Sequence, residues 1–408
     1  MVTLPARPLW RGRALAVFGI ALMAFSMRSA VASLSPMLRL IERDLTIPVW
    51  VVGLIATAPP LCFAVVGMLT PALERRFGLQ QLAVVVLAVV TVGLVARAFA
   101  SSAWMLLAAT LLIFAAVGAG NVLLPPLVKV YFPDRIGLMT SVYATLMATG
   151  TFLPPLVPVP IAYATSWHVS LLVWAVFAFA ALLPWIALLR RHNAADQDED
   201  AVRRSVAGRL WRLPLAWAMV VPFAASAVYA YTAFAWLPSI MTDLAGVDAV
   251  QAGLLLALFG AVGLPCSLVI PVLVARYRHS VGALFALAII GGLVGVAGLA
   301  WAPQTAPWLW SIALALLNLL FPLLLVLLNL RTRTHEASVA LSGFVQSIGY
   351  AIGAAVTFLV SVLHDVTGGW NAVLITLAVV ALASAPAGML VVRPHTVEAD
   401  WERRHGSW

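Results

Sequence analysis

The stretch AVFGIALMAFSMRSAVASLSPML, residues 16–38, holds a single charged side chain, Arg28. A run of about 20 predominantly apolar residues is long enough to cross the hydrocarbon core of a bilayer as a helix. Arg28 would then lie near the middle of the span, where a lone cation costs from about 3 to more than 10 kcal/mol. Such a residue is expected to face a cavity lined by protein or water and to have a partner there.

The composition places the whole chain in the membrane class. Of its 408 residues, 63% are hydrophobic and 10% are charged, so a soluble globular domain is excluded. The first apolar run leads into more membrane sequence, and we expect no cleaved signal peptide. Cys62 and Cys266 lie in separate apolar runs and are interpreted as packing residues. The net charge of +9 comes from basic residues scattered between apolar runs, so we expect no nucleic-acid partner.

Uncharged intervals mark the predicted spans. Seven intervals have the length of one span: 45–73, 77–96, 98–128, 213–242, 249–275, 337–364 and 366–392. Two are about twice as long, 136–189 and 279–330, and we expect hairpins that fold near residues 167–168 and 303–307. With the Arg28 span, the sequence predicts twelve membrane helices. No two-residue alternation is visible, which favours an all-α integral membrane protein over a β-barrel.

The distribution of basic residues predicts the orientation. Most arginines lie in loops on the side of the N-terminus, whereas the opposite side holds Arg39, Arg43 and Arg97. By the positive-inside rule, both termini are expected in the cytoplasm. We therefore predict a multi-pass protein of a bacterial-type inner (plasma) membrane.

A polar stretch near the middle divides the twelve spans into two sets of six. We predict an N-terminal bundle at 1–190, a cytoplasmic linker at 191–211, a C-terminal bundle at 212–393 and a cytoplasmic tail at 394–408. The acidic run 196–200 is interpreted as part of a solvated linker. In the fifth predicted span, four prolines indicate irregular helix geometry: Pro154, Pro155, Pro158 and Pro160.

The two sets of spans resemble each other. Residues recur at a nearly constant offset, in the pairs Gly53/Gly253, Pro71/Pro271, Arg76/Arg276, Phe77/Tyr277, Gly150/Gly353 and Trp167/Trp370. An internal repeat of six spans predicts two bundles with a binding site at their interface, near the middle of the membrane.

This architecture resembles the major facilitator superfamily. The stretch ERRFG at 74–78 is loosely similar to that superfamily's acidic-Arg-x-Gly loop. More specifically, MRSA at 27–30 with SLSP at 33–36, and GNVLLPPLVK at 120–129 with YFPDRIGLMT at 131–140, resemble the cyanate and nitroimidazole permease branch. The resemblance implies a secondary transporter for small anionic or polar solutes.

The sequence places no acidic residue where it would pair with Arg28. All fifteen acids lie in loops, span ends or tails. The nearest, Glu42 and Asp44, would be about 21–24 Å away along one helix. We therefore expect Arg28 to bind an anion brought by the solute, since a guanidinium can hold two oxygens at once. The alternative is an arginine satisfied by backbone carbonyls and water at a helix break.

Other polar residues are candidates for the same site. Asn121 lies in the middle of the fourth span and is either a solute ligand or an interhelical contact. Gln346 and Tyr350 share a face of the eleventh span. The repeat offset places Tyr143 opposite Gln346, so these residues would flank the cavity as a pseudo-symmetric pair.

Two aromatic residues of the seventh span, Tyr229 and Trp236, complete the predicted binding set. Helix packing is the alternative role for both, since aromatic residues at this density commonly fill space between helices. Near the predicted midplane there is no Asp, Glu or His. We therefore expect uniport, exchange or coupling through the solute's own protonation, with Glu42, Asp44 and Asp243 as alternative titrating gates.

Three functional classes were weighed. A membrane enzyme would need a catalytic or metal-binding motif, and none is found, so we predict no enzyme and no cofactor or metal. A channel or sensor would favour pore-lining rings in an oligomer over an internal repeat. We predict a monomeric transporter whose partners are a small, anionic solute and the lipid bilayer. The second candidate is a multidrug-type efflux pump for neutral heteroaromatic compounds.

Overall fold

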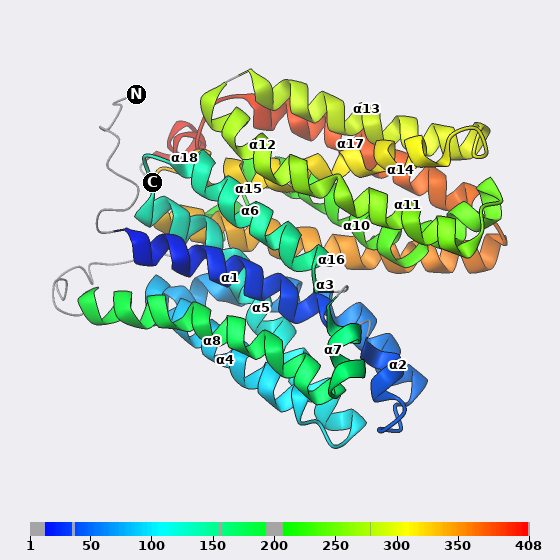
Figure 1. Ribbon diagram of the computed structural model, residues 1–408. Helices are drawn as coiled ribbons and strands as arrows, with labels where there is room; N and C mark the ends of the chain where they lie inside the picture. Colours follow the sequence, from blue (N-terminus) through cyan, green and yellow to red (C-terminus); the bar gives the residue numbers. More distant parts are fainter. Residues whose placement is uncertain (1–12, 35–36, 155–156, 193–206, 278, 407–408) are drawn as a thin grey trace. The chain divides into compact units, whose positions relative to one another are not determined.

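The computed structural model describes residues 13–34, 37–154, 157–192, 207–277 and 279–406. Within these ranges the chain is helical and contains no strand (Figure 1). The first eight helices are α1 (Ala14–Ala32), α2 (Leu38–Ile41), α3 (Val49–Phe77), α4 (Leu79–Ala98), α5 (Ala103–Tyr131), α6 (Ile136–Phe152), α7 (Pro158–Ala164) and α8 (Trp167–His192). The predicted all-α class is confirmed.

The remaining elements follow the central linker. They are α9 (Ala207–Leu210), α10 (Pro214–Ala245), α11 (Ala249–Ala261), α12 (Gly263–Arg276), α13 (Ser280–Trp301), α14 (Pro307–Leu316), the 3₁₀ turn η2 (Leu317–Leu319), α15 (Leu320–Leu330), α16 (His335–Thr367), α17 (Asn371–Val392) and α18 (Val397–His405). The chain forms two compact units, Met1–Gly208 with Thr334–Gly343, and Arg209–Arg333 with Phe344–Trp408. The predicted acidic run 196–200 lies outside the described residues.

Ten helical segments of the described chain are long and apolar enough to cross a membrane. Two of them combine consecutive helices, α11 with α12 and α14 with α15. The predicted second span corresponds to α3, and the fifth to α6 followed by α7, where the proline-rich segment interrupts the helix as expected. Both predicted hairpins are found, because one helix ends and the next begins at 164–167 and at 301–307.

The first helix ends earlier than its apolar sequence predicts. α1 stops at Ala32, where the Ser33 N–H donates to the carbonyl of Ser29 at 3.0 Å, and helix resumes only at α2. Pro36, which lies outside the described residues, disfavours helical geometry in the residue before it. Arg28 is thus four residues from the end of a regular helix, about 6 Å along its axis. The separation of 21–24 Å from Glu42 and Asp44 assumed a continuous helix, and the helix is not continuous between Ala32 and Leu38.

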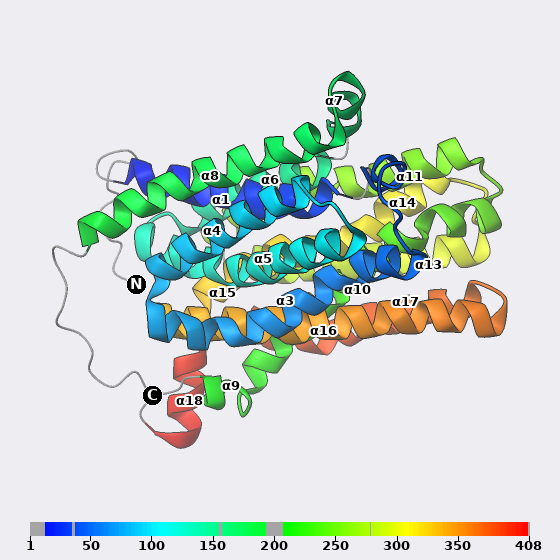
Figure 2. The same cartoon turned by 90° about the horizontal axis from the view of Figure 1, so that it is seen from below.

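Buried apolar side chains pack together at the end of the first unit where α2 lies. Figures 1 and 2 place α2 and α7 at this same end of the unit. The buried cluster draws on the end of α1, on α2 and on neighbouring ends of α3, α4, α5 and α8: Leu34, Met37, Ile41, Val51, Ile55, Ala98, Ala100, Leu106, Leu107, Trp167 and Leu171. It anchors the segment that follows the break in α1.

The predicted internal repeat appears as repeated contacts. At the end of α3 the Arg76 guanidinium lies 5.6 Å from the ring centre of Phe77, and at the end of α12 Arg276 lies 5.7 Å from that of Tyr277. Cation–π pairs of this kind contribute about 0.5–1 kcal/mol at exposed sites. The two halves therefore use the same local contact at corresponding helix ends.

A second repeated contact joins the region after the first span (Asp44) or its last turns (Asp243) to the start of the last long helix of the same half. The indole N–H of Trp167 donates to Asp44 at 2.7 Å, and that of Trp370 donates to Asp243 at 2.9 Å. Both tryptophans are buried. A histidine ring stacks on each, with ring centres 3.6 and 3.8 Å apart: His168 on Trp167 and His364 on Trp370. The carboxylates of Asp44 and Asp243 therefore fix the start of α8 and of α17.

Replacing either buried tryptophan by phenylalanine should destabilise its own unit. Trp167→Phe or Trp370→Phe removes the indole donor but keeps an aromatic ring, and we expect a loss of about 1 kcal/mol of unfolding free energy. Melting of the purified protein in detergent measures the loss. Trp301→Phe, at a side chain that is 85% exposed, is the control. Melting temperatures equal to wild type in both variants would show that these hydrogen bonds contribute nothing.

A bidentate ion pair ties the start of α1 to the loop between α5 and α6. The Arg13 guanidinium contacts the two carboxylate oxygens of Asp134 at 2.6 and 3.1 Å, and it donates to the carbonyl of Tyr131 at 3.2 Å. The Asp134 side chain is 8% exposed. The hydrogen bond from Arg13 holds the pKa of the Asp134 carboxyl below its usual value. Asp134 belongs to the stretch 131–140 that resembles the permease branch.

This ion pair predicts an acid-dependent loss of stability. A carboxyl whose pKa is depressed by folding stabilises the protein above its unfolded pKa, near 4, and that contribution is lost as the pH falls through the folded value. We expect Asp134→Asn to melt below wild type at pH 7, with a difference that shrinks below about pH 4. Asp365→Asn, at an exposed position, is the control. A melting difference that stays constant with pH would contradict the ion-pair origin.

Candidate functional site

Arg28 lies half-buried on α1, between the buried side chains of Met27 and Ser29. The backbone of α6 comes very close at Gly150. A Cβ atom there would lie 2.7 Å from the carbonyl oxygen of Phe25 and 3.1 Å from the Cβ of Arg28. Any larger residue would push the two helices apart, so the glycine allows α6 to pack against α1 beside the arginine.

The counterpart of this contact occurs in the second unit. Gly353 of α16 would, with a Cβ, meet the Cβ of Ala227 on α10 at 2.9 Å. The helix pair α1–α6 thus corresponds to α10–α16, as the Gly150/Gly353 repeat predicts. The Cβ of Arg28 is itself one of the contacts of Gly150, and Ala227 takes the corresponding place on α10, with Tyr229 two residues further along that helix. The repeat is therefore asymmetric in chemistry: a cation on α1, and an alanine on α10.

Asn121 is buried on α5, with 3% of its side chain exposed. Two glycines just before it bring neighbouring helices close. A Cβ on Gly118 would lie 3.0 Å from the backbone of Phe63 on α3, and one on Gly120 would overlap the Met27 side chain on α1. The sequence GAGN thus places the Asn121 amide in a layer where α1, α3 and α5 are in close contact.

Tyr143 lies fully buried on α6. Its hydroxyl lies against the side chain of Thr140, one turn earlier on the same helix. Residues three apart share a helix face, so the two hydroxyls lie on the same side of α6.

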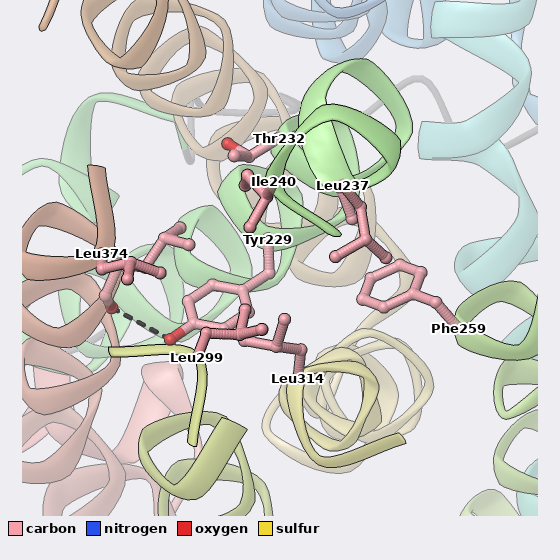
Figure 3. A pocket seen from close by; sticks show the side chains of 10 residues that line it. Tyr229, Thr232, Leu237, Ile240, Phe259, Leu299, Leu314 and Leu374 are labelled. Carbon is pink, nitrogen blue, oxygen red and sulfur yellow. Dashed lines mark hydrogen bonds between the residues drawn. The ribbon is translucent and has the colours of Figure 1, made fainter. Parts of the chain in front are cut away.

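Tyr229 lies inside the second unit, where it joins α10 to α17. Its hydroxyl donates to the carbonyl of Leu377 at 3.0 Å, as the dashed line in Figure 3 shows. A small pocket beside the ring is lined by Tyr229, Thr232, Ala233, Leu237, Ile240, Phe259, Leu299, Leu314, Leu374 and Leu377. This lining is almost wholly apolar. The contact fits the packing role that we weighed for Tyr229, and a role in solute binding stays a prediction.

Trp236 belongs to an aromatic cluster of the second unit. Its indole N–H donates to the Ser361 hydroxyl at 3.2 Å, and its ring centre lies 5.8 Å from those of both His364 and Trp370. This cluster adjoins the bond between Trp370 and Asp243. Trp236 is half-buried, so part of the ring remains open to contact.

Gln346 and Tyr350 lie one turn apart on α16, with 1% and 4% of their surface exposed. The Tyr350 ring packs edge-on against Phe223, with ring centres 5.1 Å apart, and lies 6.5 Å from Tyr231. The predicted shared face is therefore present, and it packs on aromatic residues of α10. The cavity shared by the seven predicted residues stays a prediction.

Arg97 is the candidate that the sequence analysis missed, because it was assigned to a loop. The side chain is fully buried at the end of α4. Its Nη1 donates to the carbonyl of Ala30 and its Nη2 to the hydroxyl of Ser33, both at 2.9 Å. The signal was present in the sequence, since Arg97 is a lone charge between the uncharged intervals 77–96 and 98–128. Arg28 was predicted to be a binding residue because it, too, is a lone charge within an uncharged stretch.

The chain matches the family model described as Major Facilitator Superfamily over residues 17–354. It belongs to the major facilitator superfamily. The protein is therefore a multi-pass membrane transporter of small solutes and not an enzyme. Its fold is that of the superfamily, with two six-helix halves.

Three similar proteins come from Bacillus subtilis and Escherichia coli. The chain is 31% identical to the transporter YycB of Bacillus subtilis over 395 residues, 96% of each chain. It is 28% identical to the 2-nitroimidazole transporter of Escherichia coli, covering 94% of this chain and 96% of that one. It is 25% identical to the cyanate transport protein CynX of Escherichia coli, covering 86% and 90%. The predicted resemblance to the cyanate and nitroimidazole branch is confirmed.

A solved structure of the superfamily has the same fold. The proton:xylose symporter XylE superposes with a TM-score of 0.75 over 95% of this chain and 99% of that chain, at 13% identity. At this identity the likeness concerns the fold alone.

Gly150→Ala should disturb the surroundings of Arg28. The new methyl group would lie 2.7 Å from the Phe25 carbonyl oxygen, and overpacking of this kind costs about 1–3 kcal/mol. We expect lower melting temperature and reduced transport. Gly253→Ala, where a Cβ meets no atom within 4 Å, is the matched control and should be neutral or slightly stabilising. Equal behaviour of the two variants would show that the close approach is unimportant.

Proposed function

We propose that this transporter moves a small anionic or polar solute across a bacterial inner (plasma) membrane by alternating access, and that Arg28 binds the negative charge of the solute. The observation that carries the proposal is a half-buried guanidinium on an otherwise uncharged membrane helix, next to the close glycine contact with α6. The orientation with both termini in the cytoplasm, and action as a monomer, are part of the same proposal.

Arginine suits this role because of its shape and charge. The guanidinium is planar, stays charged and offers paired N–H donors to two oxygens, or to the ends of a linear anion. In a partly dehydrated site the attraction between opposite charges is several times stronger than in water. The similarity to a protein named as a cyanate transport protein supports a small anion as the solute.

Polar groups of the first unit would complete the solute's contacts. Asn121 can both donate and accept, and the buried Tyr143 hydroxyl can do the same. From the second unit we propose Gln346 as a polar contact, and Tyr229, Trp236 and Tyr350 as aromatic ones.

The proposed mode of energy coupling follows from the positions of the acidic residues. Glu74, Glu398 and Asp400 are buried acids, and each lies near the end of its helix or in α18, away from the middle of a span. We therefore propose uniport, exchange or coupling through the solute's own protonation. Glu42, Asp44 and Asp243 are the alternative titrating gates, although Asp44 and Asp243 each already accept a hydrogen bond from a tryptophan.

A second candidate is efflux of neutral heteroaromatic compounds. It is favoured by the similarity to a protein named 2-nitroimidazole transporter and by the partly open Trp236 ring, on which such a compound would stack. The same experiment decides between the two candidates, because only an anion depends on the charge of Arg28.

The test is thermal stabilisation of purified protein by cyanate, nitrate, benzoate, 2-nitroimidazole and a cationic dye. We expect one or more anions to stabilise wild type, and Arg28→Gln to weaken their apparent affinity by about 10- to 100-fold, as for loss of a charged hydrogen bond. The control is Arg43→Gln, which removes a charge at an exposed position on the predicted side opposite the N-terminus. Stabilisation by neutral compounds that is unchanged in Arg28→Gln would make the arginine structural and favour heteroaromatic efflux.

A further inference from the structure

The complete burial of the Arg97 cation is costly, and the proposed transport function does not explain it. A guanidinium with no exposed surface lies at the end of α4, beside the apolar cluster that includes Ala98 and Ala100. Its contacts are a backbone carbonyl and a serine hydroxyl, and it forms no ion pair with any residue that the structure describes. Burying a cation without a counter-ion is expensive, so a role other than stability is indicated.

Both hydrogen-bond acceptors of Arg97 lie at the C-terminal end of α1. The last carbonyls of a helix have no partner within the helix, and in lipid water does not supply one. The Ala30 carbonyl is one of these, and Arg97 donates to it. The partial negative charge at a helix C-terminus also attracts a cation. The guanidinium thus supplies a hydrogen-bond donor where α1 ends.

The same contacts lie next to the proposed solute ligand. Ala30 and Ser33 follow Arg28 by two and five residues, about 3 and 7.5 Å along a helix axis. The planar guanidinium donates in two directions, to a backbone atom of α1 and to the residue that ends it. This two-point contact fixes both the rotation and the end point of the last turn, which follows directly on Arg28.

We propose that Arg97 is a positioning residue for Arg28. It holds the last turn of α1 against α4, so that the Arg28 guanidinium stays in one orientation toward the solute. A lysine at position 97 would keep the charge but provide a point contact in place of the planar fork. This inference rests on the proposed function of Arg28 as the anion ligand.

The test measures affinity for the best stabilising anion of the panel, with cyanate as the first probe. We expect Arg97→Lys to weaken anion affinity about tenfold, and Ser33→Ala, which removes one of the two acceptors, to weaken it about threefold. Affinity for 2-nitroimidazole should change less than twofold in both variants. Arg43→Lys is the matched control. Because Ser33→Ala keeps the charge and the carbonyl contact, it serves if Arg97→Lys does not fold.

A double-mutant comparison separates positioning from general destabilisation. In an Arg28→Lys background, Arg97→Lys should cause little further loss of anion affinity, because the orientation of Arg28 is already lost. An equal loss in both backgrounds, or an equal loss for the anion and 2-nitroimidazole, would overturn the proposal. Wild-type anion affinity in both Arg97→Lys and Ser33→Ala would overturn it too. If Arg28→Gln itself leaves anion affinity unchanged, the proposed function fails instead, and the two failures are distinguishable.

Discussion

A membrane helix that stops within the apolar part of a protein must be given hydrogen-bond donors, and a buried cation must be given acceptors. In the first unit these two requirements satisfy each other, since Arg97 of α4 donates to the last turn of α1. Neither group would be tolerated alone, because an unpartnered carbonyl or charge in a dry environment costs several kcal/mol. The break in α1, the chain direction into α2 and the position of Arg28 all depend on this contact.

The two halves of the internal repeat share the same local contacts and differ in chemistry at one place. Each half has an arginine over an aromatic ring, a carboxylate that accepts from a buried tryptophan, and a glycine at a close helix contact. These contacts close each bundle at its ends and along one helix pair. At the place of Arg28, however, α10 carries Ala227, with Tyr229 two residues further along. The two halves therefore share a scaffold but differ in chemistry beside this glycine contact.

The sequence was sufficient for the class, the spans and the repeat, because these depend on where charges are absent over 20 residues. It was not sufficient for the end of α1, since the apolar sequence continues past Ala32, where the helix stops. Asp44 and Trp167 were each noted, but their hydrogen bond joins residues 123 positions apart, and only the fold brings them together. Arg97 was misplaced because its acceptors are a backbone carbonyl and a serine, which leave no charge pattern in the sequence.

Arg28, Gly150 and Arg97 all belong to the first unit, and this matters for alternating access. A ligand that must serve both the loading and the release of a solute should keep its geometry while the surroundings change. Gly150 limits the movement of α1 against α6, and Arg97 limits the movement of its end against α4. The cation is thereby held by two helices of its own bundle. A guanidinium whose orientation is set before binding needs less ordering when a ligand arrives, and this is the advantage that the proposed role of Arg28 would draw from both contacts.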